Sequence, residues 1–594
     1  MTERAGSIAR TGPARFARGY FFFGCVMLTG LVATSSFAQV LPPVFDPTLR
    51  SGEPPLKKIP PPPVAPPGTV LPPAPRPPET DTRQQLGQVR VFVHDIHVVG
   101  STVFTDAEID EVTKPYKGRT LTTEDLERLR VALTLLYVNR GYITSGAVIP
   151  DQDVTLGTIT IQIIEGTLAR LDVEGTDWFQ DSYLRDRVEL GVRKPLAIAP
   201  LQERLQLLQQ DSRLERINAE LRPGERRGES TLNLRVKEAS PWKAWIDLNN
   251  HQPPVVGAER GLATIAHQNL TGHGDPFSFT YGRSRGVTPI IDTAYTLPIT
   301  RYDTTVTGYY RRNDFLVIDD AFRFLDLKAD AEIIGVTLRQ PLYRTLTDEF
   351  AVAITGERLY NKITTAEPGL AQLFIPGSSD TGVNTVSALR FIQEYVHRTS
   401  NSVIAARSRF TVGLNVLGAT NNSGPVPDTQ FFAWLGQIQG IRRVDEWGGV
   451  QFMGHMSLQL ANDRLFPLEQ VPVGGRFSVR GYRENTLIRD NAFLATVESR
   501  IPLVTYPTGE PRVQFAQFVD LGRSWNAKGG TPDPETLASV GLGLRWTVLP
   551  QQRAWMEVYW GLPLNYNNVH RPEGDARDPL QDNGLHVQIV VQVL

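Results

Sequence analysis

The stretch Ser539-Val540-Gly541-Leu542-Gly543-Leu544-Arg545-Trp546 alternates between apolar side chains and small or charged ones. Successive side chains of a β-strand point to opposite faces, so this stretch predicts a strand with one apolar face and one polar face. The same alternation returns at residues 585–593 and at 407–416. The alternating pattern therefore predicts that the carboxyl-terminal part of the chain is a β-sheet.

From Trp242 onward helical periodicity disappears and sixteen alternating or β-rich stretches follow one another. Their predicted starts lie near Trp242, Glu259, Gly274, Thr288, Asp303, Asp330, Asp348, Thr385, Val403, Phe431, Trp447, Ala492, Arg512, Leu537, Ala554 and Gly584. Short connections (344–347, 399–402) alternate with longer ones (313–327, 361–383, 461–491, 562–583). An even strand number with short turns opposite long loops is typical of a bacterial outer-membrane β-barrel.

Charged residues on the polar faces of these strands indicate where water lies. The residues in question are Arg407, Arg409, Glu498, Arg500 and Arg545. A basic side chain facing lipid at the midplane would cost about 2–4 kcal/mol, so we expect this face to line the lumen. Lipid admits no open sheet edge, so the sheet must close on itself. A sixteen-stranded barrel is too wide to be filled by its own side chains, so it needs a plug or serves as a passage.

The composition excludes several other classes of protein. The chain has 594 residues, and its 61 basic and 63 acidic residues leave a formal charge of −2, which gives no overall field to recruit nucleic acid. A mean hydropathy of −0.21 excludes a helical membrane bundle. The single cysteine, Cys25, excludes an intrachain disulfide framework and a cysteine-based zinc site.

Two amino-terminal segments precede the ordered part. Residues 1–38 combine four arginines, an apolar run at 20–33 and the small-residue site Ser36-Phe37-Ala38, which predicts a secretory signal peptide. Residues 39–84 form a proline-rich linker, with sixteen of the 44 prolines between Pro42 and Pro78. Such a segment favours extended polyproline II and acts as a spacer, or offers a docking motif to a proline-binding partner.

Residues 85–166 and 167–239 predict two small modules with the same order, β-α-α-β-β. In the first, a strand over 91–98 precedes two capping boxes, Thr105-x-x-Glu108 and Thr122-x-x-Asp125, each of which opens a helix. A sheet of this kind leaves an edge strand, which is either blunted by charges or accepts an extended client strand.

Exported tandem modules before a sixteen-stranded barrel (240–594) resemble the two-partner secretion transporters of the outer membrane, the haemolysin secretion/activation family. Their periplasmic modules are called POTRA domains. Asp247-Leu248-Asn249-Asn250 and Asn269-Leu270-Thr271-Gly272-His273-Gly274-Asp275 are similar to the family's first hairpin and turn. Gly474-Gly475 and Val479-Arg480-Gly481-Tyr482 resemble the signature of the long sixth loop (461–491), and Phe518-Val519-Asp520-Leu521-Gly522 resembles the strand motif that the loop arginine meets.

The resemblance implies a conformational lock in which Arg480, Gly481 and Tyr482 of the loop meet Asp520 of a strand. Gly481 permits a sharp turn, Tyr482 supplies a rigid aromatic ring, and Arg480 offers a planar fork to a carboxylate. Val479, Gly474, Gly475, Phe518 and Gly522 would support this motif. Family members commonly begin with a helix in the pore, but residues 39–78 are proline-laced, which leaves open whether a helix or the sixth loop alone obstructs the lumen.

The implied function is the export of one unfolded exoprotein with an amino-terminal β-helical secretion domain. Periplasmic modules would recognise it, and the barrel would be placed in outer-membrane lipid by the barrel-assembly machinery of a Gram-negative bacterium. An assembly factor of the same superfamily and a passive porin are the alternatives. We expect no nucleic-acid partner, cofactor or metal, and no enzyme activity, because no metal-ligand spacing, nucleophile elbow or Walker loop is present.

Overall fold

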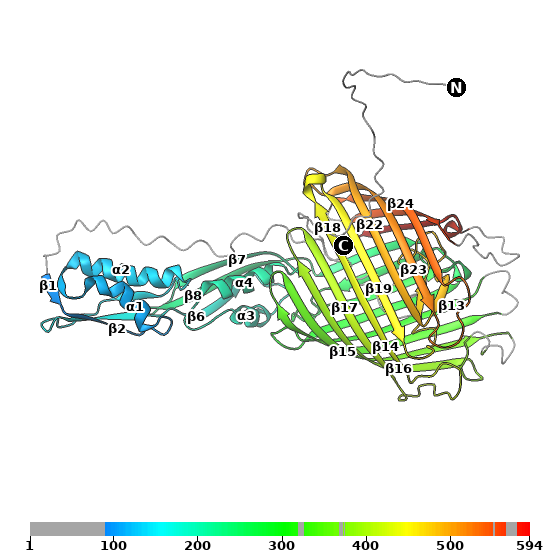
Figure 1. The fold of residues 1–594 in the computed structure, drawn as a ribbon, viewed down its shortest axis with the longest axis horizontal. Coiled ribbons are helices and arrows are strands. Elements are labelled where there is room, and N and C mark those ends of the chain that lie inside the picture. The colour runs from blue at the N-terminus through cyan, green and yellow to red at the C-terminus, as the bar shows by residue number, and fades with distance from the viewer. Residues whose placement is uncertain (1–89, 319–325, 367–371, 373–374, 551–552, 566–578) are drawn as a thin grey trace, which may run out of the picture.

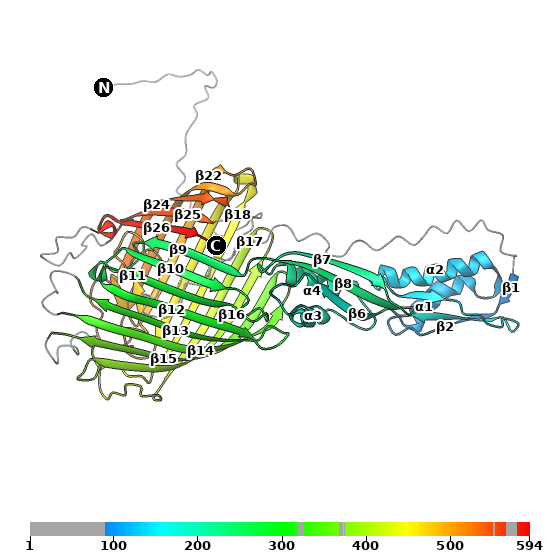
Figure 2. The same ribbon diagram turned by 180° about the vertical axis from the view of Figure 1, so that it is seen from behind.

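The computed structural model describes residues 90–594 except 319–325, 367–371, 373–374, 551–552 and 566–578. Two small α/β modules lie in a row beside one large barrel (Figure 1), and the opposite view shows the same linear arrangement (Figure 2). The predicted signal peptide (1–38) and proline-rich linker (39–84) lie outside the described residues.

Module 1, residues 90–164, contains two short sheets and two helices. Its elements are β1 (Arg90–Val93), β2 (Asp95–Val99), α1 (Asp106–Thr113), η1 (Lys114–Tyr116), β3 (Arg119–Thr122), α2 (Thr123–Asn139), β4 (Gly146–Val148) and β5 (Thr158–Ile164). The strand order is β2-β5-β4, with β1 paired separately to β3. The strand predicted over 91–98 is therefore divided, because its two halves pair with different strands. At the break, the His94 N–H donates to the Gly157 carbonyl at 2.7 Å.

Both predicted capping boxes are confirmed. Thr105 accepts from the Glu108 N–H and the Glu108 carboxylate accepts from the Thr105 N–H; Thr122 and Asp125 repeat the arrangement. Each box satisfies amides that a helix start otherwise leaves without partners. The inner face of α2 then packs on the sheet in a core that includes Leu129, Leu133, Tyr137, Ile159 and Ile161.

Module 2, residues 167–238, has the predicted order β-α-α-β-β. Its elements are β6 (Thr167–Glu174), α3 (Asp181–Glu189), α4 (Ile198–Gln209), β7 (Leu214–Pro223) and β8 (Glu229–Glu238). The strand order β6-β8-β7 puts the ten-residue β7 at one edge of the sheet. Leu184, Leu201 and Leu205 of the two helices are fully buried against Leu232 and Leu234 of β8. The helices therefore cover one face of the sheet, whose edge strands are β6 and β7.

The carboxyl-terminal part is a closed barrel of sixteen antiparallel strands, as predicted. The strands are β9 (Trp242–Asn249), β10 (Arg260–His267), β11 (Phe277–Ser284), β12 (Val287–Pro298), β13 (Thr305–Leu316), β14 (Lys328–Arg344), β15 (Asp348–Thr364), β16 (Val383–Arg398), β17 (Ser402–Leu414), β18 (Phe432–Val444), β19 (Val450–Ala461), β22 (Asn491–Thr505), β23 (Pro511–Trp525), β24 (Thr536–Leu549), β25 (Ala554–Pro563) and β26 (Leu585–Gln592). Single 3₁₀ turns lie at η2 (Pro254–Val256), η4 (Asp445–Trp447) and η6 (Leu580–Asn583). Pairing of β26 with β9 closes the circle.

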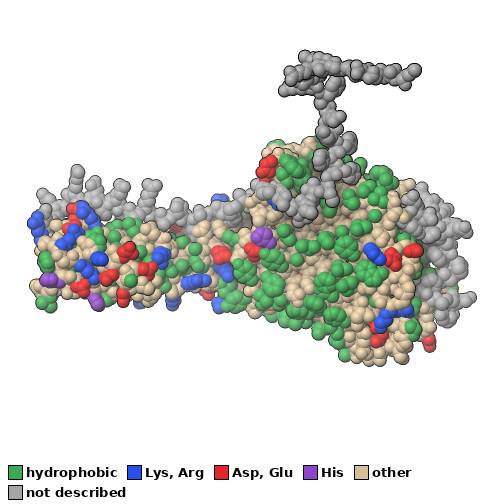
Figure 3. Space-filling view, in the orientation of Figure 1, with side chains coloured by type: hydrophobic (Ala, Val, Ile, Leu, Met, Phe, Trp, Pro, Cys, Tyr) green, Lys and Arg blue, Asp and Glu red, His purple; other side chains and the backbone are tan. Residues whose placement is uncertain are grey.

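Side chains of opposite character cover the two faces of the barrel wall. Val497 and Val519 point outward and are 63% and 55% exposed, whereas their neighbours Glu498 and Asp520 are 4% and 0% exposed. Hydrophobic side chains spread over the outer surface of the barrel in Figure 3, while charged ones gather on the modules and near the barrel ends. The outer face therefore suits lipid, whereas Glu498 and Asp520 of the wall lie on the inner face. Within residues 90–594, the described helices include none that could span a membrane.

Candidate functional site

The sixth outer loop, loop 6, connects β19 to β22 and folds back into the barrel. It contains a short hairpin formed by β20 (Val471–Val473) and β21 (Leu487–Arg489). Val479, Arg480 and Tyr482 at its turn are all buried. The loop signature predicted from the sequence is therefore enclosed by the barrel wall.

Arg480 binds the carboxylate that the sequence motif indicated. Its Nε and Nη2 donate to the two oxygens of Asp520 on β23, both at 2.8 Å, and its backbone N–H donates to the same carboxylate at 3.0 Å. The side chains are 3% and 0% exposed. A planar guanidinium matches a carboxylate in this paired geometry, so the contact fixes both position and orientation.

A second carboxylate, Glu498 on β22, was predicted to face the lumen but not to bind Arg480. The Arg480 Nη1 donates to Glu498, whose other oxygen accepts from Arg500 at 2.6 Å and from Tyr559 at 2.9 Å. The Arg480 guanidinium also lies 3.5 Å from the centroid of the Phe518 ring, which gives a cation–π contact. Register could have indicated Glu498, because it lies opposite Phe518 in the β22–β23 ladder.

Gly481 and Tyr482, the other residues of the predicted lock, pack closely against the barrel wall. Gly481 has φ +94°, and a Cβ there would lie 2.7 Å from the Gly561 carbonyl oxygen of β25. No other residue fits this backbone and this gap. The Tyr482 hydroxyl donates to the Ala538 carbonyl oxygen at 3.0 Å.

The supporting residues predicted from the motif surround the lock. Gly474 and Gly475 open the turn, where the Gly475 N–H donates to the Val479 carbonyl at 3.0 Å. Val479 is fully buried with Val473. Gly522 lies against these two valines, since a Cβ there would approach both within 2.7 Å.

The remaining predicted lumen charges lie on the inner face in ion pairs or buried positions. Arg545 contacts Glu557 of β25 at 3.0 Å, and Arg407 contacts Glu394 of β16 at 2.9 Å. Arg409, on the same face as Arg407, is 2% exposed. The inner wall therefore carries paired charges of both signs.

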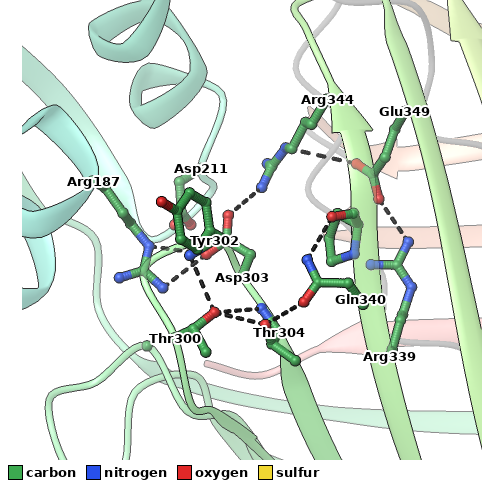
Figure 4. Close-up of polar contacts among 12 residues, drawn as sticks. Arg187, Asp211, Thr300, Tyr302, Asp303, Thr304, Arg339, Gln340, Arg344 and Glu349 are labelled. Carbon is green, nitrogen blue, oxygen red and sulfur yellow. Dashed lines mark hydrogen bonds and ion pairs between the residues drawn. The ribbon is translucent and has the colours of Figure 1, made fainter. Parts of the chain in front are cut away.

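Sequence reasoning missed the junction between module 2 and the barrel. Arg187 of α3 donates two hydrogen bonds, of 2.9 and 2.7 Å, to Asp303 in the turn between β12 and β13 (Figure 4). The other Asp303 oxygen accepts from Arg344 at the end of β14, also at 2.7 Å. Asp303 thus joins the module to two barrel strands. Nothing local signals this pair, whose members are 116 residues apart in sequence.

A second part of the junction meets the turn between β10 and β11. The Gln180 N–H donates to the Gly272 carbonyl at 2.9 Å, and Arg213 donates to the Gly274 carbonyl. Burial acts to raise the pKa of Asp211, but the Arg213 guanidinium 2.6 Å away holds the pKa of that carboxyl below its ordinary value. The predicted turn motif at 269–275 is therefore a part of the barrel that module 2 contacts.

Among the described residues, no cluster of three or more histidine, cysteine, aspartate or glutamate side chains could hold a metal ion. The described site consists of ion pairs and close packing that join loop 6 and module 2 to the barrel.

Comparison with known proteins places this architecture among transporters built from POTRA modules and an outer-membrane barrel. A family model described as haemolysin secretion/activation protein ShlB/FhaC/HecB matches residues 228–546, and a model of the ShlB-type POTRA domain matches 91–166. The chain belongs to the ShlB/FhaC/HecB family.

Individual relatives agree with this assignment. The outer membrane transporter CdiB of Escherichia coli is 26% identical over 410 residues, which cover 67% of each chain. The hemolysin transporter ShlB of Serratia marcescens is 27% identical over 518 residues, covering 82% of this chain and 84% of that protein. Among solved structures, CdiB from Escherichia coli superposes with a TM-score of 0.61 at 23% identity, covering 87% of this chain and 92% of that one.

The family assignment establishes several of the expectations. The protein is a two-partner secretion transporter of the outer membrane, with α/β modules before a sixteen-stranded barrel. Its family consists of transporters rather than enzymes, and its partner is a secreted exoprotein.

Proposed function

We propose that this transporter exports one unfolded exoprotein through the barrel lumen, and that loop 6 is the removable closure of that passage. The observation that carries the proposal is the loop turn enclosed in a closed barrel and held there by Arg480. Displacement of the turn exchanges one enclosed ion pair for solvated groups, so it needs a client or another binding event to favour it. The client is an exoprotein whose amino-terminal secretion domain folds as a β-helix outside the cell.

The client first pairs with a sheet edge of the modules. The edge strand β7 is ten residues long, whereas β6 at the other edge of the same sheet has eight, and the edge strands β2 and β4 of module 1 have five and three residues. An exposed edge offers backbone N–H and C=O groups to an extended chain, and a longer edge offers more of them. Asn218 and Glu220 of β7 are exposed, so client side chains can lie beside them when the client pairs with this strand.

Photo-crosslinking during export tests this docking site. A photoreactive amino acid at Asn218 of β7 is expected to capture the client, because the client backbone lies beside this strand. The matched control is the same substitution at the exposed Asp186 of α3, on the helical layer. Equal capture at both positions would reject β7 as the docking edge.

Removal of the modules tests the function itself. We expect deletion of residues 91–238 to abolish export while the barrel still inserts, as judged by heat-modifiable migration on gels. Undiminished export would overturn the client-docking role. Loss of many unrelated barrels, in place of one exoprotein, would identify an assembly factor.

The remaining parts of the chain have supporting roles in this proposal. Residues 1–38 are the signal peptide, 39–84 the linker, 85–166 and 167–239 the two POTRA domains, and 240–594 the barrel. The barrel-assembly machinery inserts the barrel into outer-membrane lipid, with the modules in the periplasm. Mass measurement of the mature chain tests the signal peptide, since cleavage after Ala38 removes Cys25.

A further inference from the structure

A second ion-pair cluster holds loop 6 far from the Arg480 lock. Arg390 of β16 donates to the Glu469 carboxylate of loop 6 from Nη1 at 3.1 Å and from Nη2 at 2.7 Å. Both side chains are 3% exposed. Strands β17, β18, β19 and β22 lie between β16 and Asp520 of β23, so the two contacts reach different parts of the barrel wall. Here the wall supplies the cation and the loop supplies the anion, the reverse of the Arg480 lock.

Apolar side chains reinforce this second contact. Leu465, Phe466 and Leu468 of loop 6 are buried in one cluster with Leu359 of β15 and Val386 of β16. The first arm of loop 6, residues 462–470, is therefore fixed to the wall by packing as well as by charge. Burial of these three side chains favours the docked arm by the area they remove from water.

The partners of Arg390 make this contact releasable. Glu357 of β15 also accepts from Arg390, at 2.7 Å from its Nε, and from the hydroxyl of Tyr309. When Glu469 leaves, Arg390 keeps Glu357 as its partner, and Glu469 enters water. Neither charge is then left buried and unpaired, which is the expensive outcome for a buried ion pair. Arg390 thus has a carboxylate partner on the wall, Glu357, whether or not the loop is docked.

We propose that Arg390 is a positioning residue for loop 6, which binds Glu469 and fixes the first arm of the loop independently of the Arg480 lock. Loop 6 is then fastened to the wall at two ends, at β15 and β16 by its first arm and at β22 and β23 by its turn. Opening of the passage requires release of both. This inference rests on the proposed role of loop 6 as the closure of the lumen.

Thiol labelling tests the anchor without reference to export. In a Cys25→Ser background, Leu468→Cys reports on the first arm and Val479→Cys on the turn, since both side chains are buried. Labelling of a buried thiol proceeds through local opening, so Glu469→Gln is expected to raise the rate at Leu468→Cys on the order of tenfold. The rate at Val479→Cys stays unchanged. Asp520→Asn has the reverse effect on the two reporters.

Two matched variants separate positioning from general weakening of the barrel. Glu394→Gln removes another carboxylate from β16, whose ion-pair partners among the described residues are Arg339 and Arg407 on neighbouring strands, and it is expected to leave both labelling rates unchanged. Glu469→Asp keeps the charge and is expected to restore slow labelling at Leu468→Cys. If Glu469→Gln does not migrate as a folded barrel, Arg390→Lys replaces it, with the same expected acceleration.

If the labelling rate of Leu468→Cys is the same with Glu469 present as in the Glu469→Gln variant, the proposal that Arg390 and Glu469 fix the first arm is wrong. Planar-bilayer conductance then tests the link to closure: the double variant Glu469→Gln/Asp520→Asn is expected to open more often than either single variant. Faster labelling with no change in conductance would keep the anchor and reject the role of loop 6 as the closure.

Discussion

Two arginine–aspartate pairs join distant segments of this transporter, and they differ in their surroundings. Arg480 and Asp520 meet inside the barrel with side chains 3% and 0% exposed, whereas Arg187 and Asp303 meet at the periplasmic mouth with side chains 10% and 29% exposed. Distances in the two pairs are nearly the same, 2.8 and 2.7 Å. Judged by these distances alone, the two ion pairs would contribute equally to stability.

The two ion pairs differ in how far water reaches their side chains. Breaking a buried pair by removing one partner costs about 3–5 kcal/mol because a charge is left without water, whereas an exposed pair contributes about 0–1 kcal/mol. The inner pair is therefore expected to resist separation more strongly, as the proposed closure of the lumen by loop 6 requires. The outer pair joins module 2 to the barrel through a buried Arg187 and a partly exposed Asp303, so we expect its contribution to lie between these two limits.

The largest expected effect is that of Asp520→Asn. It leaves the buried Arg480 guanidinium with Glu498 as its remaining carboxylate, so we expect the docking of the loop turn to lose about 3 kcal/mol, the lower end of the range for a buried charge that loses its partner. Urea titration of the purified barrel, followed by tryptophan fluorescence, measures the change. The double variant Arg480→Met/Asp520→Leu removes both charges and should recover much of the loss. A single variant as stable as the natural chain would remove the contrast between the two pairs.

Gly481→Ala is expected to come next. A positive φ costs an L-residue about 1–3 kcal/mol, and here the new methyl group also meets the Gly561 carbonyl oxygen. The matched control is Gly418→Ala, where φ is +74° and nothing lies within 4 Å. Loop-turn labelling at Val479→Cys should rise with the first variant and not with the second. Equal acceleration by both variants would mean that labelling at Val479→Cys reports a general loosening of the barrel and not the contact between Gly481 and Gly561.

Asp303→Asn is expected to have a smaller effect. Asparagine tolerates the φ of +60° at this position, so the variant removes charge without backbone strain. We expect a loss of about 1 kcal/mol at this partly exposed site and a broader distance distribution between spin labels at Asp186→Cys and Thr508→Cys, in a Cys25→Ser background. Asp326→Asn, also at positive φ and paired with Lys328, is the control and should leave the distribution unchanged.

The smallest effect is expected for Glu174→Gln in module 2. Glu174 and Arg235 form a pair whose side chains are 52% and 59% exposed. Water already solvates both groups, so we expect no measurable change in export or in the urea midpoint. A clear loss would mean that this face of module 2 contacts the client.

The sequence predicted the parts of this molecule that follow from local periodicity. Strand alternation located all sixteen barrel strands, and residue spacing located both capping boxes of module 1. The pairing of Arg480 with Asp520 came from the resemblance to a family, since no periodicity relates residues 40 positions apart.

Contacts that depend on how the chain folds back could not be predicted in the same way. Glu469 meets Arg390 only because loop 6 turns inward, and Arg187 meets Asp303 only because module 2 sits against the barrel mouth. Arg390 and Glu394 lie an even number of positions apart on β16, so strand alternation places them on the same face. No sequence pattern indicated that Glu469 of loop 6 binds Arg390.

Gly561 of β25 determines how closely the loop turn can approach the barrel wall. The recess that receives Gly481 exists because the wall has no side chain there: a Cβ at Gly561 would lie 2.5 Å from the Gly481 nitrogen. Substitutions that preserve hydropathy and charge would usually pass unnoticed on a barrel wall. At this position one added methyl group would collide with the Gly481 backbone, so alanine at Gly561 is expected to keep the loop turn from packing fully against β25.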